Sequence, residues 1–385
     1  MTTLREKFAK RDAEAKSRLK EVFEFRNTRA AVVLYDVNYW TFGELQEEIP
    51  EDYYGEDPRV MMEYQLKKIQ SHYEYYQDDC YLAFLMPWYG TAVLASGFGH
   101  PVVKNYKADP AADISRVQNP DELKSLKLPD PRKDGLMPQV LRTLSYFREH
   151  TDLPVGVTDC QGPLTTALSI IGYDKFCYWM YDCPRVVHGL MDLVTEALIE
   201  WVKAQKLHAH IPMEAEAYPN GVRLPEGYGG VWISDDDSVI MSTDLYRDFV
   251  MPYNSRVLTA FGGGCIHYCG NSNQHIESYL KTKGLTAINN FNLDDLKGAE
   301  EMRRALEKKG IVYMAGDFIP TEERLPRYYR DLLEAMGDQK GLIIVPYVVP
   351  AVELERGRYN ECHRNQFDLG KRVYSLVEGA IASRA

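Results

Sequence analysis

The sequence predicts one α/β domain folded as a (β/α)8 barrel. Eight short apolar or β-branched runs alternate with amphipathic helical stretches along the 385 residues, with no break in composition. Continuous apolar strands separated by helices are typical of a parallel sheet covered on both faces. An open dinucleotide-binding sheet is disfavoured because no Gly-x-Gly-x-x-Gly turn follows an early strand. The predicted strands are residues 31–36, 81–86, 153–158, 231–234, 264–269, 286–291, 311–315 and 342–345.

Helices are predicted around these strands from their apolar periodicity. Residues 1–28 predict a helix in an N-terminal extension over 1–54, and the barrel is assigned to 55–385 with a long proline-containing loop at about 104–134. The clearest helix covers 184–208, because Pro184 suits a first turn and apolar residues recur at helical spacing after it. Another helix should follow Ser242 and Thr243, which can cap it, and two more should cover 294–309 and 322–336.

Composition and charge exclude several classes of protein. The 45 basic and 56 acidic side chains give a net charge of -11, whereas a general nucleic-acid binder would carry a basic footprint. No apolar run reaches the roughly 18 residues that cross a bilayer, and the charged N-terminus is unlike a signal peptide. We therefore expect a cytoplasmic protein, and the seven irregularly spaced cysteines fit a reducing compartment. The 27 tyrosines suggest a pocket with aromatic walls.

Polar residues directly follow several predicted strands. Active sites of (β/α)8 barrels lie at the carboxyl ends of their strands, so these residues are candidate site residues. Asp235 and Asp236 are candidate catalytic groups, because neighbouring carboxylates beside an apolar run repel one another unless a cation or a hydrogen-bond donor offsets the repulsion. The candidates for substrate binding are Asp159, Gln161, Asn271, Asp317 and Tyr347.

The pair His267 and Cys269 predicts a metal site. Residues i and i+2 of a strand share a face with Cα atoms about 6.6 Å apart, and imidazole with thiolate suits Zn2+. Cys265 shares this face but would lie about 13 Å from Cys269 on a straight strand, so it is rejected as a ligand. A third ligand must come from another strand end, and Asp235, Asp236, Glu214, Tyr347 and Glu353 all remain candidates. In the alternative interpretation, His267 is a core histidine bonded to a backbone carbonyl.

Three stretches resemble the uroporphyrinogen decarboxylase superfamily. They are Gln-Gly-Pro-Leu-Thr-Thr-Ala-Leu at 161–168, Ser-Thr-Asp-Leu-Tyr-Arg-Asp-Phe-Val-Met-Pro-Tyr at 242–253, and Ile-His-Tyr-Cys-Gly-Asn at 266–271. The resemblance implies a distorted TIM-type barrel with its pocket at the carboxyl ends of the strands. The third stretch looks like the zinc-binding strand of the methyltransferase branch, which holds zinc with His-x-Cys and a distant cysteine. That cysteine would fall near Val348, where this chain departs from the pattern.

The resemblance therefore implies a zinc-dependent methyltransferase. His267 and Cys269 would bind Zn2+, and Asp235 or Asp236 would complete or flank the site. The methyl donor would be a methylcobalamin-like corrinoid. Because no Asp-x-His-x-x-Gly corrinoid motif occurs in this chain, the corrinoid would arrive on a separate carrier protein. Besides that carrier, the expected partner is a small-molecule substrate, and the barrel also allows a homodimer.

Two other functions remain open. The first is a metal-independent decarboxylase or lyase acting on a tetrapyrrole-like or small carboxylated substrate, in which Asp235 or Asp236 would stabilise a protonated ring nitrogen. The haem-pathway enzymes of the superfamily carry an Arg-Gln-Ala-Gly-Arg motif near the first strand. This chain has Tyr-Asp-Val-Asn-Tyr-Trp at 35–40 instead, which disfavours uroporphyrinogen itself. The second is a non-catalytic barrel that binds a corrinoid or its carrier.

Overall fold

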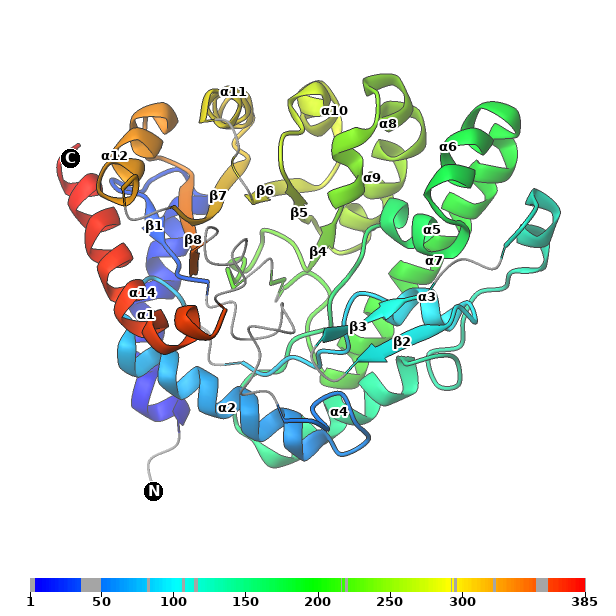
Figure 1. The fold of residues 1–385 in the computed structure, drawn as a ribbon, viewed down its shortest axis with the longest axis horizontal. Coiled ribbons are helices and arrows are strands. Elements are labelled where there is room, and N and C mark those ends of the chain that lie inside the picture. The colour runs from blue at the N-terminus through cyan, green and yellow to red at the C-terminus, as the bar shows by residue number, and fades with distance from the viewer. Residues whose placement is uncertain are drawn as a thin grey trace.

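A parallel sheet at the centre of the molecule is surrounded by helices (Figure 1). The computed structural model describes residues 4–35, 50–81, 84–105, 108–113, 117–215, 217–218, 221–291, 293, 296–320, 323–350 and 359–384. The sheet has six strands in the order β1-β8-β7-β6-β5-β4, and every neighbouring pair is parallel. Its strands are β1 (Ala31–Val32), β4 (Val231–Ser234), β5 (Gly264–Cys269), β6 (Leu285–Phe291), β7 (Val312–Ile319) and β8 (Leu342–Pro350).

Two extended segments complete the circuit between β1 and β4. Leu85 forms a parallel bridge with Val155, and Gln161 forms one with Ser234 of β4. On the other side, the Asp79 amide donates to the Val32 carbonyl at 2.7 Å. The described residues of the predicted strands at 81–86 and 153–158 therefore lie where a second and a third barrel strand belong. Eight segments follow one another around the ring, as a (β/α)8 barrel requires.

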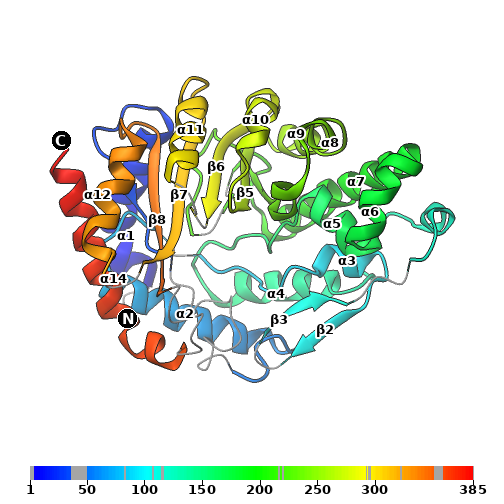
Figure 2. The same cartoon turned by 45° about the horizontal axis from the view of Figure 1, so that its top comes forward.

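The helices form the outer layer in both ribbon views (Figures 1 and 2). None of those in the described residues is long and apolar enough to cross a membrane. The α-helices are α1 (Leu4–Phe23), α2 (Pro58–Tyr75), α3 (Val93–Gly97), α4 (Met137–His150), α5 (Pro163–Ile171), α6 (Tyr173–Asp182), α7 (Pro184–Ala209), α8 (Thr243–Phe249), α9 (Met251–Ala260), α10 (Ile276–Lys281), α11 (Leu296–Glu307), α12 (Leu325–Met336) and α14 (Tyr359–Ala382). Among the described residues, three short 3-10 helices are η3 (Pro120–Ser125), η4 (Asp236–Ile240) and η5 (Asn273–His275).

Most of the predicted helices form over the expected residues, with one correction. Helix α7 buries its periodic apolar face, including Leu190, Val194 and Leu198. The single helix predicted after Ser242 is wrong, because the chain forms α8 and α9 with a break at Val250. Pro252 has no amide hydrogen to continue the helix and stands instead in the first turn of α9.

The stretch at 104–134 is more ordered than the long loop that we expected. Strands β2 (Val102–Asn105) and β3 (Ala108–Ala112) form an antiparallel hairpin, and η3 follows it. The hairpin carries Asp109, which sequence reasoning did not select as a site residue.

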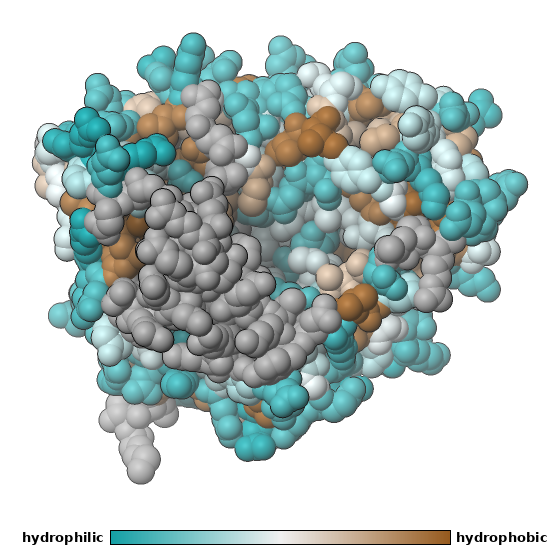
Figure 3. Space-filling model, in the orientation of Figure 1, coloured by the Kyte–Doolittle hydropathy of each residue, from teal (hydrophilic) through white to brown (hydrophobic). Residues whose placement is uncertain are grey.

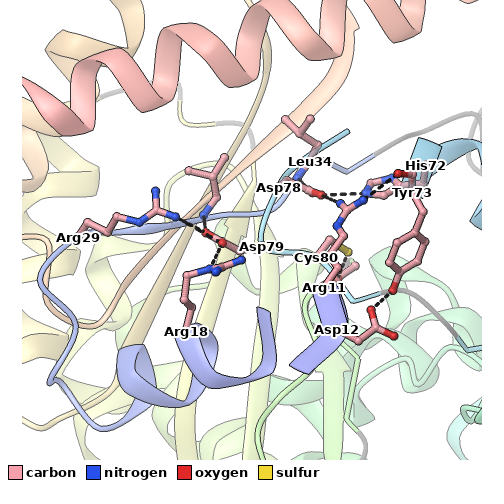
Figure 4. Close-up of polar contacts among 12 residues, drawn as sticks. Arg11, Asp12, Arg18, Arg29, Leu34, His72, Tyr73, Asp78, Asp79 and Cys80 are labelled. Atoms are coloured by element: carbon pink, nitrogen blue, oxygen red, sulfur yellow. Dashed lines mark hydrogen bonds and ion pairs between the residues drawn. The ribbon is translucent and has the colours of Figure 1, made fainter. Parts of the chain in front are cut away.

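Helix α1 is fixed to the barrel by a buried cluster of ion pairs (Figure 4). Asp78 accepts from the Leu34 amide at 2.8 Å, and Asp79 accepts from the Val32 amide at 2.9 Å. Arg11 of α1 pairs with Asp78 at 2.7 Å. Arg18 of α1 and Arg29 pair with Asp79. We call Arg11, Arg18, Arg29, Asp78 and Asp79 the arginine–aspartate cluster. The two carboxylates thus serve both the first strand and the helix that covers it.

Candidate metal centre

Three potential metal ligands meet where β4 and β5 end. Asp236 begins η4 directly after β4, and β5 carries His267 and Cys269 on one face. His267 Nε2 lies 3.4 Å from Asp236 Oδ1 and 3.7 Å from Cys269 Sγ. The three ligand atoms lie within 4.8 Å of one another. The sequence predicted His267 and Cys269 as a pair of ligands and offered Asp236 as one of five candidates for the third ligand.

These separations fit one tetrahedral zinc ion. Bonds of about 2.0–2.3 Å to zinc in a tetrahedron place the ligand atoms about 3.3–3.7 Å apart. The two separations that involve His267 Nε2 fall in this range. Cys269 is exposed and the side chain of Asp236 is 41% exposed, so solvent or substrate can reach this side of the cluster. Three protein ligands and one accessible position are typical of catalytic zinc sites.

Asn289 on β6 controls the orientation of His267. The register places Asn289 opposite His267, and Asn289 Oδ1 lies 2.8 Å from His267 Nδ1. Because an amide oxygen only accepts, Nδ1 carries the hydrogen and the lone pair of Nε2 faces Asp236 and Cys269. Both residues are buried. Metal-binding histidines are commonly fixed in this way by a hydrogen bond to their second nitrogen.

Asp236 Oδ1 supplies the evidence that a cation suits this position. This oxygen is buried and has no hydrogen-bond partner in the described part of the chain. It faces the lone pair of His267 Nε2, so two acceptor atoms lie 3.4 Å apart. Desolvation raises the pKa of the Cys269 thiol, and Asp236 raises it further. A bound cation would pair with the Asp236 oxygen, offset the repulsion between this oxygen and His267 Nε2, and favour the thiolate form of Cys269.

Asp235, the other candidate carboxylate, is directed away from this cluster. It is fully buried, and its Oδ2 accepts hydrogen bonds from Asn254 at 2.9 Å and from Tyr246 at 3.2 Å. Burial raises its pKa to about 7, and these two hydrogen bonds oppose the shift. Its backbone amide donates to the His267 carbonyl at 2.8 Å. Asp235 therefore contacts β5 through its backbone amide.

Further acidic residues lie near Asp236. Burial raises the pKa of Asp159 to about 7; the hydrogen bond from Gln161 opposes this shift and the charge of Asp236 adds to it. Burial also raises the pKa of Asp109 to about 7, with a contribution from Asp159. Tyr54 donates a hydrogen bond to Asp109. Asp159 and Gln161 thus belong to this neighbourhood, and Asp109 joins them from the β2–β3 hairpin. No sequence pattern indicated Asp109, because the strands of its hairpin are short and lack clear alternation.

Aromatic rings surround the histidine side of the cluster. Tyr347 stacks on Phe291 with ring centroids 3.7 Å apart, and Tyr35 lies 4.7 Å from Tyr347. Phe291 in turn meets the His267 ring edge to face at 5.6 Å. Burial raises the pKa of Tyr347 far above its usual value, with contributions from Tyr35, Cys269 and Asp236. The aromatic walls expected from composition are therefore present, and the molecular surface is hollowed near its centre (Figure 3).

The other sequence candidates lie elsewhere. Asn271 accepts from the Asn273 amide in a turn, and Asp317 accepts from Tyr328 of α12. Val348 is buried and supplies no ligand, and Cys265 is buried outside the cluster. Glu214 contacts Gly262, which precedes the start of β5. Glu353 lies outside the described residues.

A second group of metal-type residues has a different character. His72, Asp78 and Cys80 also bring potential ligand atoms within 4.8 Å of one another. However, Arg11 and His72 both contact Asp78 Oδ1, at 2.7 and 3.2 Å, so a cationic side chain already occupies the carboxylate (Figure 4). Burial raises the pKa of the Cys80 thiol far above its usual value. This group is part of the structural anchor of α1.

Comparison with known proteins agrees with the fold and with the resemblance. Residues 54–215 match the family model described as uroporphyrinogen decarboxylase (URO-D). A methylated-thiol–coenzyme M methyltransferase of Methanosarcina mazei is 25% identical over 155 residues, which cover 39% of this chain and 37% of that protein. A uroporphyrinogen decarboxylase of Syntrophotalea carbinolica is 28% identical over 153 residues, which cover 38% of this chain and 39% of that protein. The chain thus spans less than two fifths of the length of either curated relative.

A solved structure extends the likeness to nearly the whole fold. A methyltransferase from Methanosarcina mazei superimposes with a TM-score of 0.62 at 18% identity, covering 92% of this chain and 98% of that one. The family match itself ends before β4, so Asp236, His267 and Cys269 lie beyond it. Residues 54–215 are thus similar to the uroporphyrinogen decarboxylase (URO-D) family, and the fold of the chain is similar to that of a solved methyltransferase.

Proposed function

We propose that this chain is a zinc-dependent methyltransferase that uses Asp236, His267 and Cys269 as metal ligands. One observation carries the proposal: His267 Nε2 lies at tetrahedral spacing from Asp236 Oδ1 and Cys269 Sγ, and the hydrogen bond to Asn289 selects the tautomer with the hydrogen on Nδ1. The likeness to methyltransferases supports the class of reaction.

Asp236 takes the place of the cysteine that is absent at Val348. A carboxylate oxygen is an accepted zinc ligand and carries the same formal charge as a thiolate. One imidazole, one thiolate and one carboxylate would leave Zn2+ with no net charge. The net charge at the metal is therefore the same as with a His-Cys-Cys ligand set.

The residues around the metal would have separate roles in holding the ligands and in positioning the substrate. Bound Zn2+ would supply the Lewis acidity that keeps an acceptor thiol deprotonated near neutral pH. Asn289 holds His267, and Asp235 supports β5 through its amide. Cys269 must lose its proton to become a ligand, so metal binding releases a proton. Tyr347 and Phe291 would position the substrate beside the cluster.

We further propose a methylated corrinoid on a separate carrier protein as the methyl donor. A new bond would form between the acceptor sulfur and the methyl carbon. The bond from that carbon to cobalt would break, with its electron pair remaining on cobalt. The relative from Methanosarcina mazei, whose name includes a thiol and coenzyme M, supports a thiol acceptor.

Metal analysis tests the ligand set directly. Purified protein should contain about one zinc per chain, and the His267→Ala/Cys269→Ala double variant should contain almost none. Cys265→Ala is the matched control, because Cys265 lies on the same strand outside the cluster. Equal zinc content in the wild type and the double variant would refute the proposal.

A metal-independent decarboxylase is the second candidate. It is favoured by Asp159 and Asp235, two buried carboxyl groups whose pKa is raised to about 7, which suits proton transfer near neutral pH. Such an enzyme would keep its activity in a chelator and lose it in Asp235→Asn. The methyltransferase should lose activity in the chelator and regain it with added zinc.

A further inference from the structure

A cavity lies next to the candidate metal centre, because Asp237, which lines the cavity, follows Asp236 in η4. Its volume is about 310 Å3, and it opens between α5, α6, η4 and the start of α8. This volume is at the lower end of the range for small-molecule sites. The inner wall consists of Leu164, Leu168, Phe176, Met180, Met241 and Leu245.

The rim of this cavity exposes large apolar side chains to solvent. Tyr181 is 72% exposed, Ile240 is 62% exposed and Tyr173 is 38% exposed, and all three line the cavity. Tyr178, on the same helix as Tyr181, is also exposed. Scattered exposed apolar residues need no explanation, but a group of them around an apolar hollow indicates a binding site.

The charges around the cavity are negative. Asp237 lines it, and none of its described lining residues is basic. Helix α6 also carries Asp174 and Asp182. The single basic residue of α6, Lys175, donates to the Val117 carbonyl and is thereby held by that contact. An apolar cavity with one carboxylate in its wall is complementary to a molecule with an apolar frame and a single positive charge.

We propose that this cavity binds a small apolar or aromatic molecule that carries a protonated amine. The apolar frame would fill the space between Leu168 and Met180, and the ammonium group would pair with Asp237. The site is separate from the proposed methyl-transfer centre and needs no metal. It shares only η4 with that centre, through the neighbours Asp236 and Asp237.

Binding of 2-phenylethylammonium, measured by calorimetry at pH 7, tests the proposal. A probe of this size should bind with a Kd on the order of 1 mM or tighter. The neutral analogue 2-phenylethanol, with the same number of heavy atoms, should bind about fivefold more weakly, because it lacks the ion pair with Asp237. Asp237→Asn should weaken the binding of 2-phenylethylammonium to the level of 2-phenylethanol. The binding of 2-phenylethanol itself should not change. Equal binding of both probes by the wild type would overturn the assignment.

Cysteine labelling locates the bound probe. Cys177 lines the cavity, whereas Cys183 at the end of the same helix does not, and both are partly exposed. At ten times its Kd, the ammonium should slow alkylation of Cys177 about tenfold and leave Cys183 unchanged, as read by peptide mass spectrometry. Unchanged labelling of Cys177 would place the probe elsewhere and refute the site. Cys177→Trp, which fills the cavity, should abolish binding of both probes.

Discussion

At the scale of single residues, the candidate centre depends on which nitrogen of His267 carries hydrogen. If the hydrogen were on Nε2, the ring would donate to Asp236 and could not bind a metal there. The Asn289 side chain decides between the two tautomers through its 2.8 Å contact with Nδ1. Neither group is exposed enough for water to replace this bond freely.

Replacing Asn289 should therefore weaken metal binding without removing a ligand. Asn289→Leu should lower zinc affinity about 10–100-fold, because the acceptor for His267 Nδ1 is lost. Asn289→Asp keeps an acceptor and should bind zinc about as tightly as the wild type. Competition with a chromogenic chelator measures both affinities. Equal affinities for all three proteins would mean that Asn289 has no such role.

Asp236 should be replaceable by another anionic ligand. Asp236→Asn removes the charge and should lower zinc affinity by more than about 100-fold, beyond the usual loss from outer-shell changes. Asp236→Cys restores an anionic ligand, and its affinity should stay within about tenfold of the wild type. The same chelator competition measures both variants. A Cys variant as weak as the Asn variant would show that Asp236 does not contact the metal.

Part of this candidate centre could be predicted from the sequence for a definite reason. His267 and Cys269 could be paired because the alternation of a strand fixes the relation between residues i and i+2. The choice between Asp235 and Asp236 stayed open, because the turn after β4 sets their directions and no periodicity governs it. Asn289 is a polar residue in the mostly apolar strand β6, and this was the one sequence feature that indicated a role for β6 in the centre. Its pairing with His267 depends on the register between β5 and β6, which local sequence does not encode.

At the scale of elements, the arginine–aspartate cluster takes the place of regular strand pairing beside β1. Asp78 and Asp79 are each 1% exposed, yet they accept amide hydrogens of the first strand and pair with arginines of α1. Removing one partner of a buried ion pair leaves the other charge buried without compensation.

Asp78→Ala should accordingly cost about 3–5 kcal/mol of unfolding free energy. The loss leaves Arg11 and the Leu34 amide without this acceptor. Urea denaturation of the purified protein measures the change. Glu14→Ala is the control, because the Lys10–Glu14 pair is exposed and should contribute less than about 1 kcal/mol. Similar losses in both variants would contradict a special role for the buried cluster.

The same carboxylate should make stability depend on pH. Burial opposes ionisation of Asp78, but His72, Arg11 and the Leu34 amide outweigh it, so its folded pKa lies below its usual value. The unfolded chain then binds a proton at higher pH than the native protein does. The contribution of Asp78 is complete above the unfolded pKa of about 3.9 and is lost as the pH falls through the lower folded pKa.

Unfolding free energies measured between pH 7 and pH 3 check this sign. The difference between the wild type and Asp78→Asn should be constant near neutral pH and shrink as the solution becomes acidic. A difference that grows on acidification would require a raised folded pKa and would contradict the assignment.

Most elements were predictable where a periodic apolar pattern was long. The face of α7 repeats over many turns, so its bounds were predicted closely. The break between α8 and α9 was missed because the apolar spacing continues across it and only Pro252 interrupts the hydrogen bonding. The β2–β3 hairpin was missed because its strands are short and lack clear alternation. These strands pair with each other outside the barrel sheet.

At the scale of the whole molecule, the fold should not depend on the metal. The barrel core is formed by buried strands and helices, and the three proposed ligands lie at its edge. Removing zinc should leave the far-ultraviolet circular dichroism unchanged. Zinc at 1,000 times its Kd should then add about 4 kcal/mol to the unfolding free energy by mass action, as measured in urea. The His267→Ala/Cys269→Ala variant should show no such gain, and loss of secondary structure on chelation would contradict this expectation.

The pairing of β1 with β8 brings distant parts of the chain into one seam. Asn27 bonds to Gln339, 312 positions away, and Arg29 of the same segment pairs with Glu378 of α14. On a ribosome, the first strand would emerge long before its neighbour exists. The apolar side chains of the first strand would stay exposed until the eighth strand is synthesised. Closure over so long a loop is entropically costly and slow, so this barrel should complete its folding late and have reason to engage chaperones during synthesis.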